Sequence, residues 1–509
     1  MRGAIAAGHP LTAEAGAQIL ADGGTAVDAC LAAAFVSWVV ESPLTGPGAG
    51  GFLLVHRARD RRTRVLDFFV TAPGAGLRQS PAEMETIDVD FDGSTKQAFH
   101  VGAASVAVPG AVAGLATAHR MYGTVPWERL FEPAIELARN GVELTPQQAY
   151  LHVILDVILS HTESGRAIYS PGGERLTEGG RLVMRDLAGT LELFATEGAE
   201  TLYGGPLGRR ISDYVLAEGG SLTREDLRGY RVIWRRPIEA PFLGRTFVSN
   251  PPPSSGGVLL AYGLRVLDRA GLGGDLGTAD GIARLVEVMR EQNAARGPGF
   301  TRELFRGGLA RRLCEDDRVE AATARILTGT THISAVDAAG NAASLTASTG
   351  SGSGVVVPET GIHLNNMLGE HHLNPVRGRR RPGMRLTSMM APSLVLEEGR
   401  PRLVVGSAGS VRLHGAILQI VVNAIGHQLS VEDAITAPRV HLDGGHVHCE
   451  GGNDPVELDE LDRRGYDLVR WRRRNLYFGG AAAVEVRGDG TLAAAGDPRR
   501  GGHGIVVDG

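Results

Sequence analysis

The stretch TTHISAVDAAGNAASLTAS, from Thr330 to Ser348, contains two short strand patterns separated by a turn. Successive side chains of a strand point to opposite faces, so every second residue shares a face. The loop 338–340 ends in Gly340, which can adopt the left-handed backbone that a three-residue hairpin loop needs. The stretch therefore predicts an antiparallel hairpin. One face would carry Thr330, His332 and Ser334, and the other Thr331, Ile333 and Ala335.

The turn also predicts the register of the two strands. If Asp337 faces Asn341, each step away from the turn pairs the next two residues, and Thr330 faces Ser348. A bulge would shift this pairing by one residue. The hydroxyl groups of Thr330 and Ser348 are then expected to lie side by side. The simpler alternative is a hairpin whose polar face points to solvent.

The triplet Gly329-Thr330-Thr331 stands at the start of the first strand. A threonine hydroxyl is a weak nucleophile, but a threonine at a chain terminus carries its own base, because an α-amino group titrates at about pH 8. Gly329 permits the strained backbone that an internal acyl shift from nitrogen to oxygen requires. We interpret the triplet as a self-cleavage site that makes Thr330 an N-terminal nucleophile. Thr331, on the other face, is expected to assist cleavage or to pack.

The chain of 509 residues is 43% hydrophobic and 21% charged and contains 71 glycines, which describes a turn-rich globular protein. Length alone suggests two or three units, but helix and strand patterns interleave without a repeat or a long linker, which favours one body. The formal net charge of −5 disfavours nucleic acid as a partner. We interpret the basic runs 377–385 and 470–475 as solvated loops, with phosphate-binding patches as the alternative.

The cysteines and histidines form no pattern of a disulfide framework or a metal site. Cys30, Cys314 and Cys449 are odd in number and far apart. The segment 446–450 (HVHCE) and the pair 371–372 (HH) have no partner at a zinc-ligand spacing, so we expect no metal.

A glycine pattern at residues 46–51 fits G-x-G-x-x-G. It follows a helix pattern and precedes a strand pattern, which is the reverse of the dinucleotide motif, so we expect no nucleotide cofactor. The N-terminus lacks a signal-peptide pattern, and no segment reaches the roughly 18 apolar residues of a membrane span. We therefore expect a cytoplasmic protein that does not bind membranes.

Helix and strand patterns alternate along the chain. Helices are expected at 11–24 and 25–42, the second with Thr25 as its N-cap, and the glycine turn at 46–51 leads into two strands. Residues 105–235 have mainly helical patterns, and a proline-rich turn at 249–254 leads into another helix. After residue 330 the patterns are mostly strands, with one helix at 414–426 and two strands at 479–496 that close the chain. The fold class is α+β.

Several blocks, in order along almost the whole chain, resemble the gamma-glutamyltranspeptidase family. They are the hairpin stretch itself, 9–29 (HPLTAEAGAQILADGGTAVDA), 108–127 (VPGAVAGLATAHRMYGTVPW), 249–260 (SNPPPSSGGVLL), 357–366 (VPETGIHLNN), 385–412 (RLTSMMAPSLVLEEGRPRLVVGSAGSVR) and 496–502 (GDPRRGG). The resemblance implies an N-terminal-nucleophile hydrolase with a four-layer αββα sandwich. Self-cleavage between Gly329 and Thr330 would give a large chain, 1–329, and a small chain, 330–509, which stay associated as a heterodimer.

The resemblance also implies roles for individual residues. Thr330 matches the nucleophile, and Ser348 matches a second hydroxyl that hydrogen-bonds the nucleophile. Gly409 and Ser410 match the pair whose backbone N–H groups stabilise the oxyanion. The implied reaction is acyl transfer: Thr330 takes an acyl group from a small amide, and water or an amine accepts it.

The positions that bind glutamate in the family are changed. Phe69, in DFFVTAP, stands where an arginine binds the substrate's α-carboxylate, and a phenyl ring cannot replace that bidentate contact. Losing such a contact costs on the order of 2 to 5 kcal/mol. The other changes are Gly350 for an asparagine, Met367 for a glutamine and Glu370 for an aspartate. Of the family's two paired serines, Ser388 matches the first and Met389 replaces the second.

These changes predict an altered acyl specificity. Other members of the family hydrolyse small amides such as oxamate, or break a carbon–carbon bond in alkyl-proline antibiotic biosynthesis, and both activities stay open as alternatives. A serine hydrolase is disfavoured because no G-x-S-x-G motif is present. The alternative of another class is a chain that never cleaves itself and serves as a non-enzymatic binding protein.

Overall fold

The hairpin predicted between Thr330 and Ser348 lies in the middle of a seven-stranded sheet. The computed structural model describes residues 2–78, 80–90, 96–296, 299–306, 309, 313, 330–370, 380–409 and 412–509. Strands β11 (Thr331–Asp337) and β12 (Ala342–Ser348) are antiparallel, with Thr331 opposite Ala347. The Asp337 N–H donates to the Asn341 carbonyl at 3.0 Å, and Gly340 has a φ of +78°. The predicted hairpin and its register are therefore confirmed.

The seven-stranded sheet mixes strands from both sides of Thr330. Its order is β22-β1-β11-β12-β2-β3-β8. Its other strands are β1 (Gly3–Ala7), β2 (Gly50–Arg57), β3 (Arg62–Phe68), β8 (Ile233–Arg235) and β22 (His503–Val507). The two segments are thus interleaved within one sheet.

A second, six-stranded sheet packs against the first and is mixed in the same way. Its order is β21-β20-β16-β15-β10-β9. The strands are β9 (Ile238–Phe242), β10 (Arg245–Ser249), β15 (Ser393–Glu397), β16 (Arg400–Ala408), β20 (Gly480–Val486) and β21 (Leu492–Gly496). Alternate residues of β1 show how the core is divided: Ile5 packs toward helices, whereas Ala4 and Ala6 pack in the cluster that includes the second sheet.

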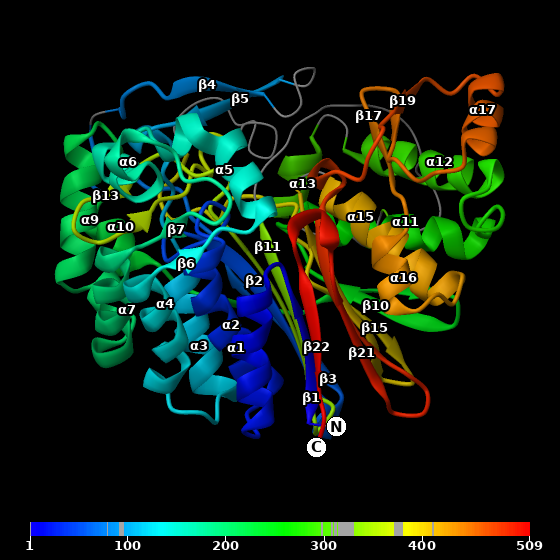
Figure 1. Ribbon diagram of the computed structural model, residues 1–509, viewed down its shortest axis with the longest axis horizontal. Helices are drawn as coiled ribbons and strands as arrows, with labels where there is room; N and C mark the ends of the chain where they lie inside the picture. The colour runs from blue at the N-terminus through cyan, green and yellow to red at the C-terminus, as the bar shows by residue number, and fades with distance from the viewer. Residues whose placement is uncertain are drawn as a thin grey trace.

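Helices cover the outer faces of the two sheets (Figure 1). On the first sheet lie α1 (Pro10–Ala21) and α2 (Ala26–Val40), both predicted from the sequence. Thr25 caps α2 in a capping box with Asp28, and every residue of α2 is buried. On the second sheet lie α11 (Ser255–Ala270) and α15 (Arg412–Val421), whose apolar residues join the same core cluster as that sheet.

The remaining helices extend these two helical coats. They are α3 (Ala111–Tyr122), α4 (Glu132–Asn140), α5 (Pro146–Leu159), α6 (Glu163–Tyr169), α7 (Arg185–Glu197), α8 (Glu200–Tyr203), α9 (Pro206–Ala217), α10 (Arg224–Gly229), α12 (Ala279–Ala295), α13 (Phe300–Arg306), α16 (Val431–Thr436) and α17 (Pro455–Arg463). Within the described ranges, no helix is both long enough and apolar enough to cross a membrane.

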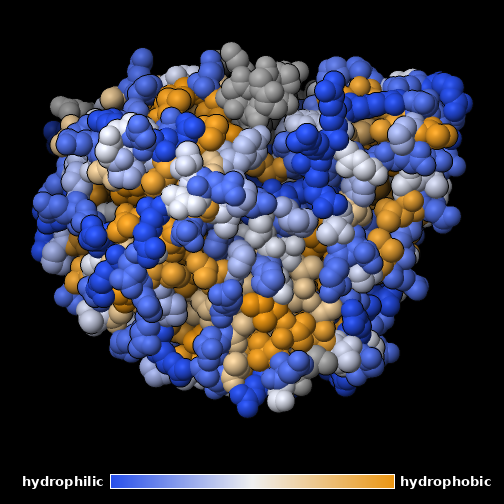
Figure 2. All heavy atoms as spheres, in the orientation of Figure 1, coloured by the Kyte–Doolittle hydropathy of each residue, from blue (hydrophilic) through white to orange (hydrophobic). Residues whose placement is uncertain are grey.

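Small sheets of two or three short strands lie outside the two main sheets. They are β4 (Glu85–Asp90) with β5 (Lys96–Val101), β6 (Val142–Glu143) with β7 (Arg181–Leu182), β13 (Val356–Val357) with β14 (Ile362–His363), and the trio β17 (Val440–Asp443), β18 (His446–Cys449) and β19 (Leu468–Arg470). Figure 2 shows mostly hydrophilic residues over the outer helices, with apolar residues between them, and an apolar patch in the lower middle of the view, where β21 and β22 lie.

Three expectations from the sequence need correction. The hairpin has no solvent-facing side, because sheet and helices cover its two faces and every residue of β11 and β12 is buried. The two strands expected to close the chain are followed by a third, β22, which pairs with β1. Arg385, in a basic run interpreted as a solvated loop, is only 6% exposed.

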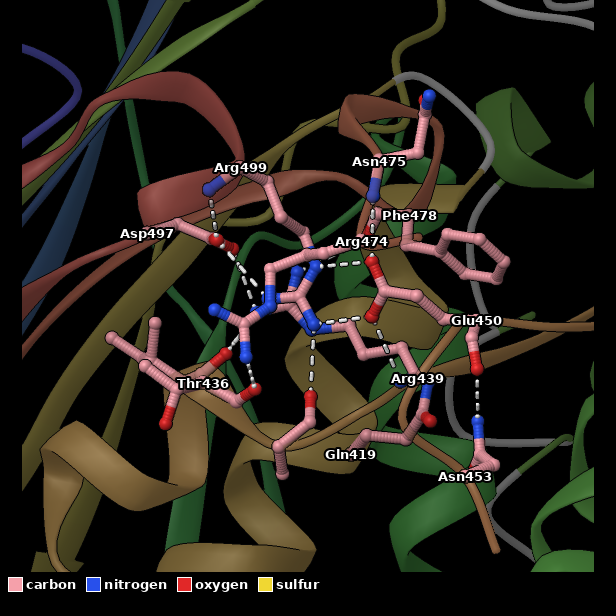
Figure 3. Close-up of polar contacts among 12 residues, drawn as sticks. Gln419, Thr436, Arg439, Glu450, Asn453, Arg474, Asn475, Phe478, Asp497 and Arg499 are labelled. Atoms are coloured by element: carbon pink, nitrogen blue, oxygen red, sulfur yellow. Dashed lines mark hydrogen bonds and ion pairs between the residues drawn. The ribbon is translucent and has the colours of Figure 1, made fainter. Parts of the chain in front are cut away.

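Two arginines and two carboxylates are buried together at the C-terminal end of α16, all in the part of the chain after Thr330 (Figure 3). Arg499 forms an ion pair with Glu450, donating from Nε to Oε1 at 2.7 Å, and donates to Asp497 at 3.1 Å. Arg439 pairs with the other oxygen of Asp497 at 2.7 Å. Backbone carbonyls of residues 435, 437 and 478 accept further hydrogen bonds from the two guanidinium groups. Each charge therefore has a partner of opposite sign.

The replacement Glu450→Gln is expected to lower the free energy of unfolding by about 3 kcal/mol, because it leaves a buried guanidinium without its full counter-charge. Chemical denaturation followed by circular dichroism measures this. The matched control is Glu359→Gln, which removes an exposed partner of Arg210 and should change stability by less than about 1 kcal/mol. Equal unfolding midpoints for the two variants would contradict the assignment.

The same network makes the stability depend on acid. Burial alone would raise the pKa of Asp497, but Arg439 and Arg499 hold it below its ordinary value. The stabilisation is therefore present above the ordinary pKa of an aspartate and is lost as the pH falls through the lower, folded-state value.

Candidate active site

Thr330, Ser348 and Phe69 lie in one row across the first sheet. Continuing the β11–β12 register by one residue sets Thr330 opposite Ser348, and Ser348 pairs with Gly50 of β2. Continuing the β2–β3 register in the same way sets Gly50 opposite Phe69. Three strand spacings of about 4.8 Å put the Cα atoms of Thr330 and Phe69 roughly 14 Å apart. The predicted nucleophile, its second hydroxyl and the changed specificity position thus share one end of the sheet.

The row also faces one direction, toward the second sheet. Cross-strand neighbours share a face, and the side chains of Phe52 and Phe69 both belong to the core cluster that reaches the second sheet. Thr330 and Ser348 are 3% and 2% exposed. The Ser348 hydroxyl accepts a hydrogen bond from the Gly350 N–H at 2.8 Å, which ties it to the following loop. Gly329, the other residue of the predicted cleavage bond, lies outside the described residues.

His332, two residues after Thr330 on the same face of the strand, is a buried residue of the core. Its Nδ1 lies 2.7 Å from the Thr346 hydroxyl and its Nε2 lies 2.9 Å from the Ser334 hydroxyl. Burial lowers the pKa of His332 to about 3, so the ring is neutral at physiological pH. A side chain at Gly406 of β16 would overlap this ring, so the two sheets touch here.

Because of that contact, Gly409, which is predicted to stabilise the oxyanion, lies at the end of the second sheet that is close to Thr330. Within β16, Gly406 lies against His332, and Ala408, the last residue of the strand, pairs with Gly480. The aliphatic part of Arg500 packs against Gly480, and the Arg500 guanidinium donates to the Thr330 carbonyl at 3.3 Å. Gly409 follows directly, with a φ of +125°. Its predicted partner, Ser410, lies outside the described residues.

Phe69 is held firmly by neighbours that the sequence did not reveal. Its phenyl ring stacks on Phe52 with centroids 5.5 Å apart, and its N–H donates to the Asp67 carboxylate at 3.0 Å. Its carbonyl accepts from the Tyr230 hydroxyl at 2.8 Å and from the guanidinium of Arg385. The Asp67 carboxylate in turn lies 3.3 Å from the Nε of Arg385. The phenyl ring is therefore fixed in apolar surroundings, with 1% of the residue exposed.

Glu370 and Gly350, two of the changed positions, lie together beside Ser348. A Cβ atom added to Gly350 would lie 2.1 Å from the Asn366 Oδ1 and 3.2 Å from a Glu370 carboxylate oxygen, and Gly350 has a φ of +76°. The asparagine that the family resemblance implies at 350 does not fit this backbone. Burial raises the pKa of Glu370 well above its ordinary value, so this position favours a neutral acid.

Met367, Ser388 and Met389 occupy different surroundings. Met367 belongs to the same apolar cluster as Phe69. The Ser388 carbonyl accepts hydrogen bonds from Ser255, and its hydroxyl accepts one from the Met390 N–H at 3.0 Å. Met389 instead packs with the helices, beside Val258, Leu259, Phe300 and Leu304. The structure thus brings Met367 to the cluster of Phe69 but packs the side chain of Met389 elsewhere.

Sequence reasoning missed a buried carboxylate that binds the residue after the predicted nucleophile. Glu41, directly after α2, accepts a hydrogen bond from the Thr331 hydroxyl at 2.6 Å. An acidic residue at the end of a largely apolar helix is a signal in the sequence, because carboxylates are rarely buried without a specific partner. Among the described residues, no group of three or more His, Cys, Asp or Glu side chains is arranged to hold a metal ion.

The chain is similar to known proteins along almost its whole length. A family model described as Gamma-glutamyltranspeptidase matches residues 12–507. The Acylase ACY 1 proenzyme of Pseudomonas sp. (strain SE83) is 35% identical, over 100% of this chain and 94% of its own. The Glutathione hydrolase proenzyme of Escherichia coli (strain K12) is 31% identical, over 98% of this chain and 90% of its own.

A solved structure extends the likeness to the fold. The cephalosporin acylase from Bacillus halodurans is similar with a TM-score of 0.83 and 26% identity, covering 100% of this chain and 96% of that one. The family model spans nearly the whole chain, and two relatives above 30% identity match it almost end to end. The chain therefore belongs to the gamma-glutamyltranspeptidase family.

Proposed function

We propose that this chain is a self-processing acylase with Thr330 as its N-terminal nucleophile. In this proposal the two sheets and their helical coats are the four-layer αββα sandwich of N-terminal-nucleophile hydrolases. The chain cuts itself between Gly329 and Thr330 into 1–329 and 330–509. Because both sheets contain strands of both segments, the two fragments stay associated after cleavage.

The proposed reaction passes through an ester on Thr330. The Thr330 oxygen attacks the amide carbon, and its proton moves to the α-amino group of the same residue. Backbone N–H groups of Gly409 and Ser410 stabilise the oxyanion. The amine leaves with the proton from the α-ammonium group. Water then attacks the ester and releases the carboxylic acid, which restores the Thr330 hydroxyl.

The observation that carries the proposal is the row of Thr330, Ser348 and Phe69. The hydroxyl pair supports acyl transfer, and the fixed phenyl ring of Phe69 offers no charge to the α-carboxylate of a glutamate. A Pseudomonas relative is named an acylase, which supports the same substrate class. We therefore assign amides whose acyl group lacks the α-amino acid end of glutamate.

A competition between water and an added amine tests the proposed ester. Hydroxylamine should divert the acyl group of an anilide substrate into a hydroxamate in the presence of the processed protein, because both acceptors attack one intermediate. Colorimetric detection with ferric ion measures the hydroxamate. Anilide hydrolysis without any hydroxamate above the uncatalysed level would contradict an acyl-enzyme.

A further inference from the structure

A short turn after α2 contacts both strands of the central hairpin at its open end, near the start of β11 and just after the end of β12. We call residues 41–45, with the sequence ESPLT, the 41–45 turn. The Glu41 N–H donates to the Ser37 carbonyl of α2 at 2.8 Å, and the Glu41 carbonyl accepts from the Leu44 N–H at 2.8 Å. The turn is thus anchored to the end of a fully buried helix.

The first contact of the turn is with the residue after the predicted nucleophile. The Thr331 hydroxyl donates to one Glu41 carboxylate oxygen at 2.6 Å, and the Thr12 hydroxyl of α1 donates to the other at 3.0 Å. Glu41 is only 6% exposed. Burial raises the pKa of the Glu41 carboxyl, whereas the hydrogen bonds from Thr331 and Thr12 and the charge of Arg500 act to lower it. The start of β11 is therefore fastened to two helices of the segment before residue 330.

Gly8 leaves the space that this contact needs. It directly follows β1, and a Cβ atom there would lie 2.5 Å from a Glu41 carboxylate oxygen and 3.3 Å from the Thr331 hydroxyl. A side chain at residue 8 would push the carboxylate away from Thr331.

The second contact of the 41–45 turn is with the residue that follows the second strand of the hairpin, β12. The Leu44 carbonyl accepts from the Thr349 N–H at 3.0 Å, directly after Ser348. Arg500 holds the Thr330 carbonyl at 3.3 Å. The 41–45 turn and Arg500 together fix the backbone on either side of the two hydroxyls that the proposed reaction uses.

Building on the proposed function, we infer that Glu41 is a positioning residue that holds the new N-terminus in register with Ser348 after self-cleavage. A chain end frays unless it is tied down. Before cleavage Thr330 is held by the chain on both sides, whereas afterwards Thr331 and the Thr330 carbonyl carry the anchoring contacts. Glu41 acts through Thr331 and touches neither the substrate nor the Thr330 hydroxyl in this role.

The inference predicts a loss of turnover that is separate from self-cleavage. Glu41→Ala and Thr331→Val should still yield two fragments on a denaturing gel. Their kcat for an anilide substrate should fall about 100-fold, the effect of a misplacement of roughly 1 Å, while KM stays within about threefold. Thr331→Ser, which keeps the hydroxyl, should restore most of the kcat. The double variant should be no slower than the slower single variant, because both changes remove one contact.

The matched control is Glu485→Ala, which removes an equally buried carboxylate, 5% exposed and paired with Arg402 at 2.8 Å. It should lower the melting temperature but leave kcat within about threefold. If Glu41→Ala does not fold, Thr331→Val still tests the contact, because it replaces only the hydroxyl group with a methyl group of similar size. Wild-type kcat in a processed Thr331→Val protein, or additive losses in the double variant, would overturn the inference. A wild-type chain that never cleaves itself or never turns over an amide would instead refute the proposed function, and the inference with it.

Discussion

The replacement Thr330→Ala is expected to leave the chain as one polypeptide and to abolish amide hydrolysis. The alanine has no oxygen to receive the acyl group of Gly329, so the peptide bond before it stays intact. Without cleavage there is no α-amino group at residue 330 to act as a base. We expect activity to fall by on the order of 10⁴-fold or more, as when other nucleophiles are removed. A denaturing gel and an anilide assay measure the two effects.

Thr330→Ser is the matched control for this prediction, because it keeps the hydroxyl in a position that is only 3% exposed. It should yield the same two fragments, although more slowly, since serine lacks the methyl group that restricts the threonine rotamer. Cleavage of Thr330→Ala at the same bond, or anilide hydrolysis at the wild-type rate, would contradict the assignment of the nucleophile.

The second large effect is a preference against γ-glutamyl substrates. The relevant comparison uses the p-nitroanilides of γ-glutamate, glutarate, 4-aminobutanoate and butanoate, which differ only in the groups on one acyl chain. Phe69 offers no hydrogen-bond donor from its side chain, so the α-carboxylate of glutamate would be buried without a charged partner, which costs on the order of 2 to 5 kcal/mol. We expect kcat/KM for the butanoyl anilide to exceed that for the γ-glutamyl anilide by a factor of roughly 30 to several thousand.

The four substrates also separate the contribution of the α-carboxylate from that of the α-amino group. Poor turnover of both carboxylate-bearing anilides would assign the preference to the missing guanidinium at position 69. Phe69→Leu keeps an apolar surface and should preserve the order of the four substrates. A γ-glutamyl anilide that is hydrolysed as well as the butanoyl anilide would show that the change at Phe69 did not alter the specificity.

The elements with strong local signals could be predicted from the sequence. Helix α2 has a capping residue, Thr25, and a long apolar run, and the hairpin has a turn that fixes its register. Strand β1 could not be predicted, because its sequence GAIAA contains mainly small residues with low strand propensity. It is a strand because β11 and β22 pair with it on either side.

The residues of the candidate site also differ in whether neighbours in the sequence determine their positions. Ser348 follows from the turn, since the register depends on neighbours in sequence. Glu41 and Arg385 could not be assigned, because their partners lie 290 and 316 residues away in the chain. Arg385 stands in a basic run that is typical of a solvated loop, and only the approach of β3 gives its guanidinium the Phe69 carbonyl to bind.

The N-terminal sequence of the smaller fragment tests the central claim most directly. Edman degradation of the processed protein, or mass spectrometry of its small chain, should give a polypeptide that begins Thr-Thr-His-Ile-Ser, from Thr330 to Ser334. A small fragment that begins at another residue, or an intact chain that still hydrolyses amides, would contradict an N-terminal threonine as the nucleophile.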